Sequence, residues 1–163
     1  LYDPANVEHV LLDKNKDKIF AERLSNLFFQ ESTETIAELL DKIGYLYENF
    51  GYYKECLKSK ERALEIAQET FNSSDIEIAT YKNNLGRTYQ ILGDYEKARQ
   101  MIESAIEIDI NNLGEEHLTT NIHKSNLATV FFDLDKFEEA SVILEEVLSN
   151  ELKYNVVNLR KKW

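Results

Sequence analysis

The feature that most constrains this chain is internal repetition at a fixed offset of 42 residues. Residues 43–47 align with 85–89 and again with 127–131, and in each copy an apolar residue, a small residue and an aromatic residue fall at matching places. The segments 51–56, 93–98 and 135–140 keep the same register. A constant period of this length is typical of stacked structural units that share one continuous core. We therefore expect three copies of one unit over residues 31–155.

Each copy contains two amphipathic helical patterns. In the second copy, residues 79–92 place Leu85, Gly86 and Tyr89 on one stripe, and residues 95–110 carry apolar residues at three- and four-residue steps. Between them, Gly93 suits the left-handed conformation after a helix end and Asp94 suits the N-cap of the next helix. The expected unit is a helix, a tight turn and a second helix.

Small and aromatic residues recur at positions where helices pack. We expect the small residues of both helices to permit close helix approach, and the aromatic residues to fill the space between successive pairs. The small residues are Gly44, Gly86 and Ala128 in the first helices and Cys56, Ala98 and Ala140 in the second, and the aromatic residues are Tyr47, Tyr89 and Phe131.

Composition agrees with a helical protein and excludes several function classes. One proline and five glycines among 163 residues are too few for the turns of a small β-sandwich or barrel. No apolar run approaches the roughly 18 residues of a membrane-spanning helix. A net charge of −11 repels phosphate backbones and anionic lipid, so nucleic acid and membranes are not expected partners. A single cysteine, Cys56, indicates a reducing, cytoplasmic location without disulfides.

The residues of the second copy resemble the tetratricopeptide repeat. The resemblance rests on Asn84-Leu85-Gly86 with Tyr89, on the segment 93–98 and on Ala105. The 42-residue period, together with Leu113-Gly114-Glu115-Glu116-His117 in the connection, is similar to the kinesin-light-chain type of this repeat. This resemblance implies an all-α fold, namely a right-handed superhelical solenoid of antiparallel helix pairs. The sequence departs from that pattern at Leu118, where the family usually has proline, at 72–75, and at Asp135 in place of a turn glycine.

The two ends of the chain fit the repeat less well. We expect residues 1–30 to form either a degenerate repeat or an N-terminal capping helix, and residues 156–163 to form a tail or the start of a further helix. The chain begins with Leu1, which suggests a fragment of a longer protein. Its oligomeric state is taken as monomeric by default.

Motifs of catalysis and of cofactor binding are absent from the sequence. It has no phosphate-binding loop, dinucleotide turn, zinc-protease helix or nucleophile elbow. Residues 13–17 begin like a calcium loop but lack its turn glycine and its final glutamate. His9, His117 and His123 have no cysteine pair to complete a zinc site, and His117 is expected to be a turn residue. The chain is predicted not to be an enzyme and to need no cofactor or metal.

The first helix of each copy is expected to line a concave groove that binds a peptide. Asn84 and Asn126 recur one repeat apart, and a side-chain amide can both donate to and accept from an extended backbone. The alternative is that each asparagine bonds a neighbouring helix or loop. Lys42 and Arg87 could hold a ligand carboxylate, or could pair with nearby acidic residues. The predicted groove residues are Lys42, Tyr45, Asn83, Asn84, Arg87, Gln90, Asn126, Thr129 and Phe132.

Two functions compete at this stage. The first is a non-catalytic interaction module that binds an extended segment of a partner protein in the groove. The alternative is a structural or sensor arm of a larger multidomain regulatory or scaffold protein.

Overall fold

The computed structural model describes residues 33–72 and 74–161, with side chains over 36–72 and 74–154. Within these ranges the secondary structure is six α-helices. The predicted N-terminal segment 1–30, with His9 and the loop at 13–17, lies outside the described residues. Of the predicted C-terminal segment 156–163, residues 156–161 continue the last helix and 162–163 lie outside the described residues. The chain divides into two compact units, residues 1–73 and 74–163, and each unit is described separately.

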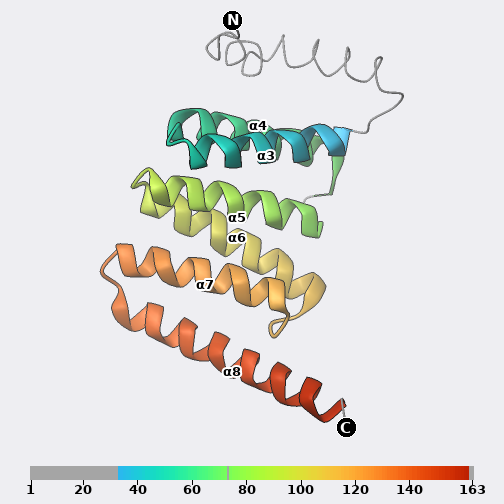
Figure 1. Ribbon diagram of the computed structural model, residues 1–163, viewed down its shortest axis with the longest axis vertical. Helices are drawn as coiled ribbons and strands as arrows, with labels where there is room; N and C mark the ends of the chain where they lie inside the picture. Colours follow the sequence, from blue (N-terminus) through green and yellow to red (C-terminus); the bar gives the residue numbers. More distant parts are fainter. Residues whose placement is uncertain (1–32, 73, 162–163) are drawn as a thin grey trace, which may run out of the picture. The chain divides into compact units, whose positions relative to one another are not determined.

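The first unit contains the antiparallel helix pair α3 (Thr33–Asn49) and α4 (Tyr53–Thr70) (Figure 1). The turn between them contains Gly51 at a positive φ of 78°. Gly44 lies where α4 approaches most closely, because a Cβ atom there would be 2.7 Å from Cγ of Lys60. The buried Ser59 hydroxyl donates to the carbonyl oxygen of Leu40 at 2.7 Å, which also ties the two helices together.

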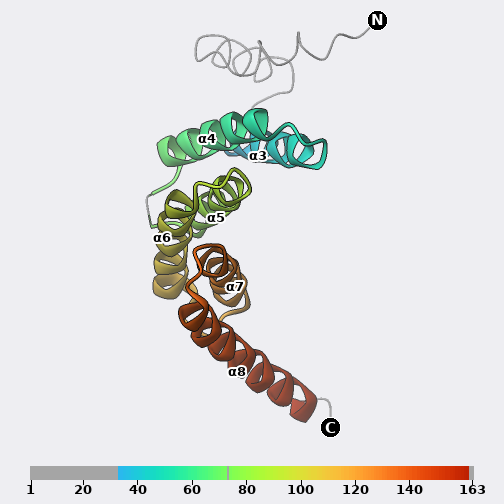
Figure 2. The ribbon, with the colours of Figure 1, turned by 90° about the vertical axis from the view of Figure 1, so that its left-hand side faces the viewer.

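The second unit contains two antiparallel helix pairs (Figures 1 and 2). The pairs are α5 (Ile76–Ile91) with α6 (Tyr95–Leu113), and α7 (Leu118–Asp133) with α8 (Phe137–Lys161). Helix α6 packs against both α5 and α7. Figure 2 shows α5 and α7 on the same side of α6, as the groove prediction requires of the first helices of successive repeats.

Each helix pair of the second unit has a left-handed residue in the turn between its two helices. Gly93 has a φ of 81°, and the carboxylate of Asp94 accepts a hydrogen bond from the backbone N–H of Lys97 at 3.3 Å. One repeat later Asp135 takes the place of Gly93 and adopts a φ of 58°. Aspartate is among the residues that tolerate this left-handed conformation, so the departure from glycine leaves the turn intact.

The predicted helix boundaries in the second repeat are close but too narrow. Helix α5 begins three residues before the expected 79, directly after Asp75 in an extended N-cap conformation. Helix α6 runs three residues past the expected 110, to the residue before Gly114, whose φ is 94°. The glycine in the connection, rather than the last apolar residue of the stripe, therefore ends this helix.

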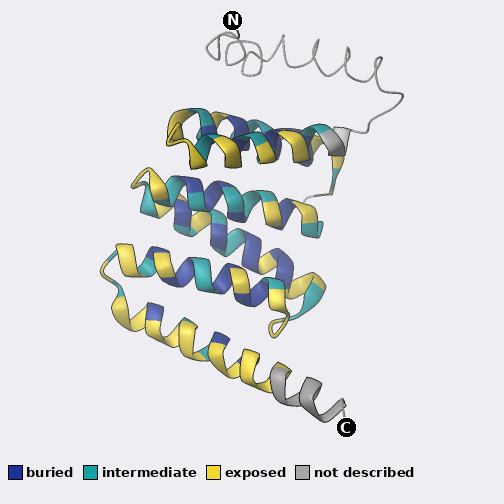
Figure 3. Ribbon diagram, viewed as in Figure 1, coloured by how far each residue is buried: buried dark blue, intermediate teal, exposed yellow. Residues whose placement is uncertain are grey.

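The core of the second unit lies between α6 and its two neighbours (Figure 3). The buried cluster consists of Ala98, Ile102, Ile106, Leu127 and Val130, with Tyr89 and Phe131 among the partly buried residues packed against it. A Cβ atom on Gly86 would lie 2.6 Å from Cγ1 of Ile102 and 3.1 Å from the backbone oxygen of Ala98. The predicted close approach at Gly86 is confirmed, as is the burial of Cys56 in the first unit.

We predict that Gly86→Leu will destabilise the protein by more than Arg87→Ala. The leucine must displace Ile102 or move α5 away from α6, and overpacking of this kind costs about 1–3 kcal/mol. Arg87 is the adjacent residue and is only partly buried, which makes it a matched control. Urea unfolding followed by circular dichroism measures both changes. Equal midpoints would show that the inward and outward faces of α5 are wrongly assigned.

Candidate peptide-binding surface on α5 and α7

Two of the nine predicted groove residues lie on α3 in the first unit. Lys42 and Tyr45 are both exposed. Lys42 forms an ion pair with Glu38 one helical turn away, at 2.6 Å, so its pairing with a nearby acidic residue, the alternative to ligand binding, is present. Tyr45 presents its ring to solvent.

Most of the other seven meet where α5 faces α7. The side-chain N–H of Asn126 donates to the side-chain oxygen of Asn83 at 2.9 Å. The side-chain N–H₂ group of Gln90 donates to Asp133 at 2.6 Å and to the Thr129 hydroxyl at 3.2 Å. We call these five residues the α5–α7 seam. Its hydrogen bonds join the first helices of two successive repeats directly.

The asparagines of the seam differ in their exposure. Asn83 is only 5% exposed, so the structure places this predicted groove residue beneath the surface, where it accepts from Asn126. Asn126 is partly exposed, and within the described part of the chain its side-chain oxygen accepts no hydrogen bond. The alternative in which the asparagine bonds a neighbouring helix therefore holds for the N–H₂ group of Asn126, which donates to α5. The side-chain oxygen of Asn126 is left to accept from a ligand. Asn84 and Arg87 lie partly buried on α5.

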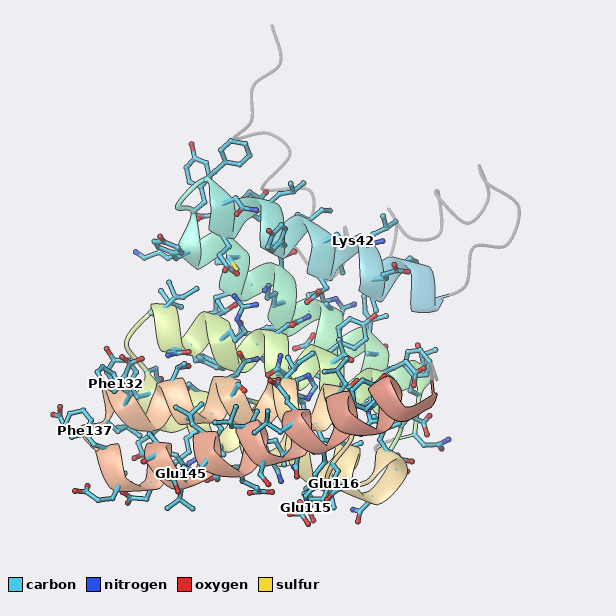
Figure 4. The ribbon with its side chains drawn as sticks, turned by 60° about the horizontal axis from the view of Figure 1, so that its bottom comes forward. Lys42, Glu115, Glu116, Phe132, Phe137 and Glu145 are labelled. Carbon is cyan, nitrogen blue, oxygen red and sulfur yellow. The ribbon has the colours of Figure 1, made fainter. Side chains whose placement is uncertain are left out.

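An apolar end adjoins the seam. Phe132 is 62% exposed and stacks edge to face on Phe137, with ring centroids 5.2 Å apart (Figure 4). Phe132 comes from the last turn of α7 and Phe137 from the first residue of α8. Along α7, Asn126, Thr129 and Phe132 follow one another at three-residue steps and so lie on neighbouring turns of one face.

The connection before α7 is held by polar contacts of its own. The backbone N–H of Thr119 donates to Nδ1 of His117 at 3.2 Å, so the predicted turn role of His117 is confirmed. Glu115 pairs with Lys124 at 3.3 Å, and Glu116 pairs with Lys153 of α8 at 2.8 Å. Both glutamates are exposed at the end of the unit in Figure 4.

A buried acid–imidazole pair joins α6 to α7, and sequence reasoning missed it. A carboxylate oxygen of Asp109 lies 2.5 Å from Nδ1 of His123, and both side chains are buried. Burial raises the pKa of the Asp109 carboxyl and lowers the pKa of the His123 imidazole, because desolvation disfavours the charged form of each. One feature of the sequence could have indicated it: the position one repeat before Asp109 is Ala67, so an aspartate occupies a position where another copy has a small apolar residue.

A second buried polar pair joins α7 to α8. The side-chain N–H of Asn150 donates to the side-chain oxygen of Asn121 at 3.1 Å, and both residues are buried. One repeat earlier the same two positions are Ala79 and Ile108, which are apolar and buried. The third repeat thus has two hydrogen-bonded amides where the second repeat has two buried apolar residues.

The described residues contain neither a cluster that could hold a metal ion nor a helix that could span a membrane. Over 33–72 and 74–161 no three histidine, cysteine, aspartate or glutamate side chains gather in a way that could hold a metal ion. In the same ranges none of the helices combines the length and the apolar character that a membrane span needs.

The chain belongs to the tetratricopeptide repeat family. Its sequence matches that family over residues 35–111 and again over 77–150, and the two matches together span all six described helices except their outer ends. No curated protein matches the sequence.

Solved structures share the fold. A putative kinesin light chain with nearly identical repeats from Podosopora anserina superposes with a TM-score of 0.70 at 22% identity, over 77% of this chain and 59% of that one. The tetratricopeptide domain of Arabidopsis FLU has a TM-score of 0.65 at 16% identity, over 75% and 99% of the two chains. The N-terminal domain of stress-induced protein-1 from C. elegans gives 0.57 at 17% identity, over 80% and 99%. The all-α repeat fold expected from the sequence is confirmed.

We predict that Asn126→Ala will destabilise the second unit by about 1–3 kcal/mol. The substitution removes the donor to Asn83, and a buried acceptor left without its partner costs about that much. Asn111→Ala on α6 is the matched control, because it makes the same chemical change at an exposed position. Thermal unfolding of both variants measures the difference. If Asn126→Ala is as stable as the control, the seam contributes nothing to the joining of α5 and α7.

We predict that the free energy of unfolding of Asp109→Asn, minus that of the unmodified protein, will grow as pH rises from 4 to 8. With a raised pKa, native Asp109 holds a proton that the unfolded chain loses above about pH 3.9. Its contribution to stability is therefore present below that pH and is lost as pH rises. The amide of the variant does not titrate and has no such loss, so the difference in stability rises with pH.

The lowered pKa of His123 acts in the same direction in this comparison. Native His123 resists a proton that the unfolded chain takes up below about pH 6.5, so its contribution is lost as pH falls. Removal of the neighbouring carboxylate makes that protonation harder still, which lowers the stability of the variant on the acid side. Glu107→Gln, at an exposed position of α6, should give a flat difference. A flat or falling difference for Asp109→Asn would contradict the assigned direction of its pKa.

Proposed function

We propose that this protein is a non-catalytic interaction module and that the exposed side of the α5–α7 seam binds an extended segment of a partner protein. Tetratricopeptide repeats are generally protein–protein interaction modules. The family supports the general class, and the seam supports the particular surface. Cys56 is the single cysteine of the sequence and is buried, which fits the cytoplasmic location that we propose for the protein.

The observation that carries the proposal is the row formed by Asn126, Thr129 and Phe132 on α7. Asn126 offers a side-chain oxygen that accepts no hydrogen bond within the described residues. Thr129 lies exposed beside it, and Phe132 presents an exposed ring one turn further on. An extended peptide presents N–H and C=O groups along its length and side chains to alternate sides. Such a row can hold backbone with its polar members and one apolar side chain with its aromatic member.

Basic residues supply the second part of the proposal. In the second unit, Arg87 is partly exposed on α5 next to the seam. In a protein of net charge −11, a cation at this place supports an acidic side chain or a terminal carboxylate as the charged group of the ligand. In the first unit, taken by itself, Lys42 and Tyr45 are exposed on α3, and Lys42 would have to release Glu38 to hold such a group, which costs little free energy for an exposed ion pair.

We predict that Phe132→Ala will weaken the binding of a selected peptide at least about tenfold. Peptides are first selected from a displayed library against the unmodified protein, and their affinities are then measured by calorimetry. An exposed aromatic residue that anchors a ligand commonly carries this much of the affinity. Tyr154→Ala on α8 is the matched control, because Tyr154 is 61% exposed and lies away from the seam.

Three results would count against the proposed surface. One is an equal loss of affinity in both variants, and another is an unchanged affinity in Phe132→Ala. The third is a selection that enriches no common motif. Asn84→Ala and Asn126→Ala belong in the same series, with unfolding measured in parallel, because Asn126 also supports Asn83.

A further inference from the structure

The last helix carries an apolar stripe away from the proposed peptide surface. Leu144, Leu148 and Leu152 follow one another at four-residue steps on α8, and all three are exposed, Leu148 by 56%. Helix α8 packs on α7 through a different face, which includes the buried Ala140 and Val147. Figure 3 shows α8 as mostly exposed along its described length. We call the three leucines the α8 stripe.

The preceding repeat shows what covers this register. One period earlier, Leu144 and Leu148 correspond to Ile102 and Ile106 of α6, which are buried. Those two isoleucines form a cluster with Leu127 and Val130 of α7. The second helix of the second repeat is thus covered by the first helix of the next repeat. In the third repeat the same register carries leucines that no described helix covers to that extent.

The charges beside the stripe restrict the occupant further. Glu145 and Glu151 are exposed on α8 next to the leucines, and Glu145 projects from the helix in Figure 4. Glu151 stands one period after Asp109, the carboxylate that meets His123 of α7. A helix that packs on α8 as α7 packs on α6 would therefore place its own residue at the His123 register against Glu151. A basic side chain suits that position.

The same charges disfavour a second copy of this chain. Two α8 helices packed through their leucines would bring Glu145 and Glu151 of each copy into one interface. Both copies also carry a net charge of −11, so their approach is opposed at long range. A like-charged interface of this kind lacks the complementarity that specific association uses.

We propose that the α8 stripe is a docking surface for an amphipathic helix of a partner protein, one that carries the apolar pattern of α7 and a basic residue opposite Glu151. The partner helix places apolar residues at the registers of Leu127 and Val130 over Leu144 and Leu148. This surface is separate from the α5–α7 seam. It repeats, one period later, the interface that α6 forms with α7. The protein thus binds a helix at the α8 stripe in addition to an extended segment at the α5–α7 seam.

The repeat supplies its own probe for a test. A synthetic peptide with the sequence of residues 117–134 carries the α7 pattern, including His123, Leu127 and Val130. It is titrated to about 1 mM, the range of weak binding, into the full chain labelled at leucine and isoleucine methyl groups. We expect saturable shifts of the methyl signals of Leu144, Leu148 and Leu152. A peptide with Leu127→Glu and Val130→Glu should produce none.

Matched protein variants assign the surface. Leu148→Glu should raise the dissociation constant of the peptide at least about tenfold, while Val142→Glu should leave it unchanged. Val142 is 66% exposed on the same helix and lies outside the stripe. Both substitutions are at exposed positions, and circular dichroism checks that both variants remain folded. Below about pH 6.5, where the imidazole of the peptide's His123 is protonated, Glu151→Lys should weaken the peptide, whereas Glu138→Lys, at an exposed position of the first turn of α8, should not.

Four results would overturn the proposal. The first is an absence of methyl shifts at peptide concentrations up to about 1 mM, and the second is an equal affinity of Leu148→Glu and Val142→Glu for the peptide. The third is a set of methyl shifts that spreads to the α6 face, and the fourth is self-association of the protein that Leu148→Glu abolishes. The third would mean that the peptide exchanges with α7 of the protein, and the fourth would assign the stripe to a second copy. None of these results depends on the α5–α7 seam, so the two proposals fail independently.

Discussion

The close approach of α5 to α6 at Gly86 is the contact on which the second unit depends. With no Cβ at that position, Ile102 reaches into the space beside the α5 backbone, and the same isoleucine then packs on Leu127 and Val130 of α7. One residue without a side chain thus positions an apolar side chain that serves two interfaces. The packing of Ile102 sets the spacing of α5, α6 and α7. That spacing in turn brings Asn126 of α7 within hydrogen-bond distance of Asn83 of α5.

Repetition allowed most of the fold to be predicted, because positions that recur in every copy report what every copy needs. The helix pairs, the left-handed turn at Gly93 and the small residue at Gly86 all belong to that shared set. The N-cap at Asp94 was predicted from its residue type alone, since the other copies carry Tyr52 and Lys136 there. Asp135 adopts the conformation that Gly93 has one period earlier, so the register is kept even where the residue type changes.

The buried polar pairs were not predicted because they use residues that differ between copies. Each of the four residues differs in chemical type from the residue one period earlier, so none of them belongs to a recurring pattern. The four are Asp109, His123, Asn121 and Asn150. Partner choice also depends on helix rotation, which sequence spacing gives only approximately. For this reason helical spacing alone placed Asn83 on the outward face, whereas the rotation of α5 places it under Asn126.

The amide pair between Asn121 and Asn150 has a consequence for the last helix. Buried apolar residues, such as Ala79 and Ile108 at these positions one period earlier, tolerate a small axial displacement, since one methyl group can replace another at little cost. Two buried amides cannot shift in this way, because each would lose its partner in a place that water does not reach. Helix α8 is therefore fixed at one axial position on α7. A helix that binds the α8 stripe thus meets leucines that do not shift along the helix axis.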